Sequence, residues 1–147
     1  LHATQCALED GVVPGGGIAL LYAKQNIKLS KDKSENFQQG QRIVQQACSK
    51  PFEQILMNAG YTETDARMVA QHDLKNPKKN SWKGYNIKTR KIVDMKEAGI
   101  LDPHKVTKNT LLNAASIAGT ILLTECTVVD NPEDKDKSDD SFNPMMM

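Results

Sequence analysis

The sequence predicts a mostly α-helical fold: a partial helical bundle with one short C-terminal β-strand and a disordered tail. Three observations predict it. Apolar residues recur at helical spacing over 43–59, small and apolar residues recur in the same way over 107–124, and the residues from 131 onward are charged and poor in apolar side chains. Recurrence every three or four residues puts apolar side chains on one helix face. A charged, apolar-poor segment cannot bury enough surface to fold.

The N-terminal part predicts two helices joined by a turn. Residues 1–10 have apolar positions on one side, and Gly11 is placed to end that helix in a left-handed conformation. The turn covers 12–17, and the second helix extends to about Lys28. After a polar, lysine-rich loop, Ser34 is suited to cap the next helix.

The middle of the chain has the clearest helical pattern. Pro51 lies inside the apolar stripe of 43–59, so it kinks that helix or restarts it at a first turn. Gly60 is the natural end. Thr62 or Thr64 caps a shorter helix. The inward-facing residues of that helix are expected to be Met68, Val69 and Leu74.

The region after the basic loop at 75–83 is predicted as short elements. Residues 85–89 favour a short strand or turn, and 91–98 favour a helix that ends at Gly99. Asp102 followed by Pro103 is typical of a helix start, with an N-cap carboxylate and a first-turn proline.

The last helix is predicted over 107–124. Its small residues permit close packing against another helix, and residues 126–130 favour a short strand. The expected buried stripe of the helix consists of Leu111, Ala115, Ala118 and Leu122.

Composition excludes several classes of function. The formal net charge of +1 provides no overall field for nucleic acid or an anionic membrane. No apolar run approaches the roughly 18 residues that a membrane span needs, and no signal-peptide pattern opens the chain. Three cysteines without CxxC pairing disfavour a disulfide scaffold or zinc cluster and favour a reducing compartment. Because the chain opens at Leu1, in what reads as a helix without a cap, a fragment or processed chain is expected.

Two features have both a structural and a functional interpretation. Glycines 15–17 precede a helix, where backbone N–H groups can approach an anion. The run matches neither a P-loop nor a dinucleotide fingerprint, so a tight helix–helix connection is the simpler interpretation. Asp102 is an N-cap, or it accepts hydrogen bonds from ribose hydroxyls. No Ser/His/Asp or Cys/His arrangement stands out, and no histidine has metal-ligand spacing.

A basic loop offers a weaker alternative. Trp82 and Tyr85 lie among lysines, which is the composition of a single-strand stacking surface. One short loop in a chain of near-zero net charge is little evidence, so nucleic acid is not expected as a partner. A membrane is not expected either.

Three blocks, in order, resemble the C-terminal part of the group I chaperonins, the GroEL family of heat-shock proteins. They are "LHATQCALEDGVVPGGGIALLYA" (1–23), "GYNIKT" (84–89) and "AGILDPHKVTKNTLLNAASIAGTILLTECTVVD" (98–130). The resemblance implies three parts. Residues 1–15 would end the return segment of the intermediate domain, 16–130 would form the C-terminal half of the equatorial ATPase domain, and 131–147 would be a flexible tail.

The resemblance also implies an ATP-dependent role in protein folding. The family forms a two-ring machine that encloses and releases non-native proteins, with ATP, magnesium and potassium ions in the full-length subunit. Implied partners are further subunits of a homo-oligomeric ring, together with a co-chaperonin and unfolded polypeptides bound by parts absent here. The phosphate-binding loop and the catalytic aspartate of relatives have no counterpart in this sequence. No catalytic or metal-binding residue is therefore expected, and the isolated chain is expected not to hydrolyse ATP.

Five residues are implied as nucleotide contacts by the same resemblance. Gly16 would lie against the nucleotide, Asn86, Ile87 and Lys88 would contact adenine, and Asp102 would bind the ribose hydroxyls. Relatives usually have small residues at the positions of Ile87 and Lys88, so contacts there would be made by backbone. Ile100 would form an apolar wall for the base.

Two further expectations come from the resemblance. The C-terminal blocks look bacterial or phage-borne, which implies the cytoplasm, with the mitochondrial matrix as the alternative. The alternative function is a non-catalytic structural or interaction module, which packs with chaperonin subunits or passively holds unfolded protein.

Overall fold

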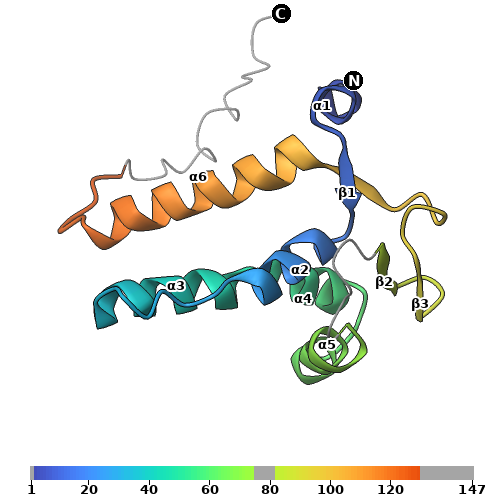
Figure 1. Ribbon diagram of the computed structural model, residues 1–147, viewed down its shortest axis with the longest axis horizontal. Coiled ribbons are helices and arrows are strands. Elements are labelled where there is room, and N and C mark those ends of the chain that lie inside the picture. The colour runs from blue at the N-terminus through green and yellow to red at the C-terminus, as the bar shows by residue number, and fades with distance from the viewer. Residues whose placement is uncertain (1, 75–81, 130–147) are drawn as a thin grey trace, which may run out of the picture.

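The computed structural model describes residues 2–74 and 82–129, and the fold is mostly helical, as predicted (Figure 1). The chain order begins with α1 (His2–Asp10), β1 (Val12–Pro14), α2 (Ile18–Asn26), α3 (Glu35–Ala47), α4 (Lys50–Asn58) and α5 (Glu63–Met68). It continues with a π-helical segment η1 (Val69–Asp73), β2 (Lys83–Asn86), β3 (Lys91–Asp94), β4 (Leu101–Pro103) and α6 (His104–Leu122).

The predicted helix ends are confirmed where local chemistry determines them. Ser34 caps α3, with its hydroxyl accepting from the Phe37 N–H at 3.4 Å. Thr62, rather than Thr64, caps α5 by accepting from the Asp65 N–H at 3.2 Å. Gly60 ends α4 with a φ of 90°, a conformation that a residue without Cβ adopts at low cost.

Pro51 restarts a helix instead of kinking one. α3 ends at Ala47 and α4 begins at Lys50, so the proline lies in the first turn of α4. A first-turn proline lacks only an N–H that would have no partner inside the helix. The long apolar stripe of the sequence is therefore divided between two helices.

The predicted turn at 12–17 contains a strand that the sequence analysis missed. β1 pairs antiparallel with β4, and Val13 lies opposite Asp102. Asp102 is consequently held in a strand, and the prediction that it caps the last helix is wrong. Pro103 occupies the cap position of α6, without a side-chain hydrogen bond.

The predicted helix at 91–98 is also wrong, because residues 91–94 form β3, which pairs antiparallel with β2. Ile92 and Val93 are β-branched, and such side chains pack well on a strand. The Asp94 side chain then accepts from the Lys96 and Glu97 N–H groups, which closes a turn after β3. The expected strand or turn at 85–89 is both: β2 runs to Asn86 and a turn follows.

The core lies where α2, α4, α5 and η1 meet the residue that follows β3. Leu74 is buried as predicted, and Val69 packs partly buried against the core, but Met68 is 61% exposed. Ala66 and Ala70, four residues apart, take the inward positions instead. The buried cluster consists of Ile18, Leu21, Phe52, Leu56, Ala66, Ala70, Leu74 and Met95.

The long helix α6 is formed as predicted, but its expected stripe is not buried. Leu111 is half-buried, whereas Ala115 and Ala118 are exposed and Leu122 is 83% exposed. α6 packs on α1 and β4, and Figure 1 shows that its C-terminal part extends away from both. A stripe is buried only where another element covers it.

The predicted C-terminal strand is not formed in its described part, residues 126–129. A strand needs a neighbour to share its backbone hydrogen bonds, and no described segment pairs with these residues. The predicted tail at 131–147 lies outside the described residues.

Candidate functional site

Residues from distant parts of the chain line a cavity of about 360 Å³. It contains four of the five predicted nucleotide contacts, and its size is within the range of small-molecule sites. Its lining residues are Gly16, Ile55, Tyr85, Asn86, Ile87, Lys88, Met95, Ala98 and Ile100. The glycine run, α4, the β2–β3 hairpin and the turn after β3 therefore meet at one site.

Crowding requires glycine at Gly15 and Gly17, and a left-handed backbone favours glycine at Gly16 and Gly17. A Cβ on Gly15 would lie 3.1 Å from the backbone of Ile100, to which the Gly15 N–H donates a hydrogen bond of 3.0 Å. A Cβ on Gly17 would lie 2.8 Å from the Phe52 nitrogen. A Cβ on Gly16 would meet no atom within 4 Å, but the φ of 65° at Gly16 is a left-handed conformation that favours glycine, and Gly16 lines the cavity. The run is therefore a tight connection whose middle residue exposes bare backbone to a cavity.

The hairpin tip, residues 86–90, is shaped by its own side chains. The Asn86 side-chain oxygen Oδ1 accepts from the N–H groups of Lys88 at 3.0 Å and Thr89 at 3.4 Å. Arg90, which follows this Asx-type turn, has a φ of 53°, outside the usual range for a side chain of its size. Because the Lys88 and Thr89 N–H groups serve the turn, they are not free to donate to a ligand, whereas each backbone carbonyl oxygen has two lone pairs with which to accept.

Asp102 lies next to the cavity without lining it. It sits in β4 two residues after Ile100, which does line the cavity. Two residues of chain span at most about 7 Å, so Asp102 lies close to the cavity wall. Asp102 is therefore near the cavity but is not one of the residues that line it.

The walls and the rim of the cavity differ in chemistry. Ile55, Met95 and Ile100 provide apolar walls, whereas Asn86 and the exposed Lys88 provide polar groups on one side. This arrangement fits a flat ring that buries its two faces and keeps polar atoms at its edge. The purine base of a nucleotide has that chemistry.

Several lining residues were missed by sequence reasoning. Ile55 belongs to the apolar stripe of 43–59 and looked like ordinary core, and Met95 fell in a segment predicted as helix. No signal in the sequence distinguishes an apolar residue that lines a cavity from one that fills a core. The glycine run had an anion-binding interpretation of its own, whereas Asn86 and Lys88 were implied only by the family resemblance.

The three cysteines and the other possible metal ligands among the described residues form no metal site. Cys6, Cys48 and Cys126 are free thiols. Burial raises the pKa of the Cys48 thiol, an effect that nearby Lys24 partly offsets. Over residues 2–74 and 82–129, no group of three His, Cys, Asp or Glu side chains is arranged to hold a metal ion.

The link between α1 and α6 includes an ion pair across the chain. Lys105 Nζ lies 2.7 Å from Glu9 Oε2, and the resulting hydrogen bond raises the pKa of the lysine. Both side chains are about half exposed, so solvent screening keeps the stabilisation small.

Among the described helices, none is both long and apolar enough to cross a bilayer.

Comparison with known families adds evidence that is independent of the geometry. Residues 1–132 match the model described as the TCP-1/cpn60 chaperonin family. The match covers most of the 147 residues and includes every residue that lines the cavity.

Proposed function

The chain belongs to the TCP-1/cpn60 chaperonin family, and on that premise we propose that it supplies the nucleoside contacts of an ATP-dependent chaperonin subunit of the group I type. Membership carries a chaperonin role in protein folding and assembly with other chaperonin subunits. In this proposal residues 1–15 end the intermediate-domain segment, 16–130 form the C-terminal half of the equatorial domain, and 131–147 form a tail.

One observation carries the nucleotide part of the proposal. Gly16 and residues 86–88 are far apart in the sequence, yet they line the same cavity. The φ of 65° at Gly16 favours glycine in any case, and the missing side chain also leaves the backbone accessible from the cavity. The side-chain-free approach at Gly16 and the apolar walls together favour a base and its sugar.

Each residue has a defined task in this proposal. Ile100 and Ile55 cover the faces of adenine, the carbonyl oxygens at 86–88 accept hydrogen bonds from its amine, and Gly16 admits the sugar. Asp102 accepts hydrogen bonds from the ribose hydroxyls. ATP supplies the energy of phosphate hydrolysis, and the residues that hold magnesium, potassium and the phosphates belong to other parts of the subunit.

Replacing Asp102 with alanine tests the site. Calorimetric titration of the chain with ATP, and separately with adenosine, is expected to show binding by the natural sequence. The Asp102→Ala variant should bind both about ten- to a hundredfold more weakly, because a hydrogen bond to a charged group contributes about 1.5–3 kcal/mol. Equal loss for both ligands follows because the carboxylate contacts the sugar and no phosphate.

Asp32→Ala is the matched control, since Asp32 is an exposed carboxylate in the loop before α3. It should leave both affinities unchanged. The proposal is wrong if the natural chain binds neither ligand, or if Asp102→Ala and Asp32→Ala bind equally well.

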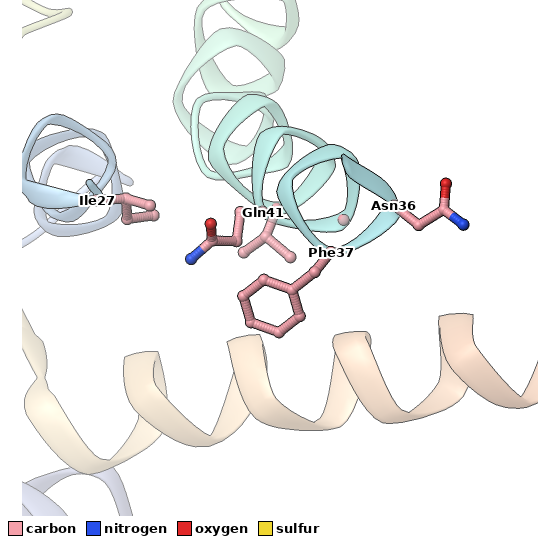
Figure 2. A pocket seen from close by; sticks show the side chains of 6 residues that line it. Ile27, Asn36, Phe37 and Gln41 are labelled. Carbon is pink, nitrogen blue, oxygen red and sulfur yellow. The ribbon is translucent and has the colours of Figure 1, made fainter. Parts of the chain in front are cut away.

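A second function, as an interaction module, is favoured by exposed apolar surface. A groove of about 580 Å³ lies along α3, and Figure 2 shows Phe37 pointing from α3 toward α6. Phe37 is 51% exposed, and α6 exposes further apolar residues. Those of α6 are Val106, Leu112, Ile117, Ile121 and Leu122. Apolar surface that no described element covers is typical of protein interaction.

Removing apolar groups from this groove tests the second function. The double variant Phe37→Ser/Val44→Ser should lose most of any ability of the chain to suppress light scattering by an aggregating client. Ile43→Ser is the control, because Ile43 is on the same helix and 65% exposed but does not line the groove. Suppression that is unchanged in the double variant would contradict passive holding through this groove.

A further inference from the structure

Two tyrosines join the hairpin to the corner between α4 and α5. The hydroxyls of Tyr61 and Tyr85 lie 3.0 Å apart in a hydrogen bond. Their rings meet edge to face, with centroids 6.4 Å apart and planes at 85°. Tyr85 lines the nucleoside cavity, and Tyr61 stands behind it, outside the cavity lining.

Tyr61 contacts the hairpin on both sides of its tip. Tyr85 directly precedes the tip, and Arg90 is the last residue of it. The Arg90 guanidinium lies 5.7 Å from the centre of the Tyr61 ring, in a cation–π arrangement. The segment that faces the cavity, 86–88, is therefore held between two contacts with one aromatic side chain.

Tyr61 is itself fixed by the end of α4. Its N–H donates to the Leu56 carbonyl at 3.2 Å, directly after the left-handed Gly60. Leu56 is fully buried, and Ile55 beside it lines the cavity. Tyr61 thus connects the end of α4, the helix that carries Ile55, with the hairpin tip.

The hydroxyl pair has a role that packing alone does not explain. Two phenylalanines would meet edge to face equally well. A hydroxyl–hydroxyl bond adds a directional constraint on both rings, and through Tyr85 on the backbone at 86–88. That backbone is what reads the edge of a base in the proposed site.

We propose that Tyr61 is a positioning residue for base recognition: it fixes the hairpin tip so that the cavity discriminates adenine from guanine. This inference rests on the proposed nucleoside site. Adenine and guanine differ in the donors and acceptors at their edges, so discrimination depends on where the tip carbonyl oxygens lie. A tip that is free to shift adapts to either base.

The test compares ATP and GTP binding by the natural chain and by Tyr61→Phe, which keeps the ring and removes the hydroxyl. The ratio of ATP affinity to GTP affinity is expected to fall about three- to tenfold, the range of one neutral hydrogen bond. Lower stability alone would weaken both nucleotides equally and leave the ratio unchanged.

Tyr22→Phe is the matched control. The Tyr22 hydroxyl donates to the Lys83 carbonyl at the opposite end of β2, so its loss weakens the hairpin without touching the tip. Its nucleotide ratio should match that of the natural chain. If the natural chain prefers ATP and Tyr61→Phe keeps that preference, the role of Tyr61 is refuted and the nucleoside site stands. If the natural chain binds neither nucleotide, the proposed site fails and this inference fails with it.

Discussion

Replacing Gly17 with alanine is expected to lower the free energy of unfolding by about 2–4 kcal/mol. Gly17 has a φ of 81°, which costs a residue with a Cβ about 1–2 kcal/mol. The new Cβ would also lie 2.8 Å from the Phe52 nitrogen and 3.0 Å from its Cα. Backbone at the start of α4 cannot move aside as a flexible side chain can, so the connection before α2 must open.

Chemical denaturation followed by circular dichroism measures this effect, with Gly40→Ala as the control. Gly40 lies inside α3, and a Cβ there would meet no atom within 4 Å. Alanine at this position should raise the free energy of unfolding by about 0.5–1 kcal/mol, because glycine is a poor helix former. If the two variants shift stability in the same direction, the close approach between Gly17 and Phe52 does not exist in solution.

The fold elements that the sequence predicted correctly are those that local chemistry determines. Ser34 and Thr62 cap helices through residues three positions away, and Gly60 ends one through its own φ. In these cases the residue that determines the helix end lies within one helical turn of that end. No distant residue is needed to form them.

The elements predicted wrongly depend on distant partners. β1 exists because residues 12–14 find β4, some ninety positions later. Asp102 and Pro103 form a good local helix start, but pairing with Val13 and Val12 holds them in a strand. Ile92 and Val93 fit a helical pattern in the sequence, but pairing with β2 makes them part of a strand. The stripe of α6 was predicted as buried because periodicity indicates which face is apolar and not what covers it.

Some residues of the candidate site could be predicted from the sequence and others could not. Gly16, Asn86 and Ile100 came from resemblance to a family, and the structure places them around one cavity. Ile55 and Met95 had no such signal, since apolar side chains look alike in the sequence wherever they are used. Tyr61 was missed because its role depends on Tyr85 and Arg90, two residues that a strand turn brings to it.

Replacing Phe52 with alanine is expected to cost about 3–5 kcal/mol, the range for deleting a buried aromatic side chain. Phe52 is 1% exposed and belongs to the cluster that joins α2, α4 and α5. A small domain is stable by only about 5–15 kcal/mol, so a large part of the population should unfold at moderate temperature. Thermal melting by circular dichroism measures the loss.

Phe37→Ala is the matched control, because the same atoms are removed from a side chain that is 51% exposed. Its melting temperature should stay close to that of the natural chain, whereas Phe52→Ala should melt well below it. The two variants should also differ in nucleoside binding. Phe52 lies in the helix that carries Ile55, and its backbone contacts Gly17, the neighbour of Gly16. Nucleoside affinity should therefore fall in Phe52→Ala even at temperatures where the chain remains folded. If the two variants melted at the same temperature, the α2–α4 contact would not be the centre of the core. The packing argument for the cavity beside that contact would then fail.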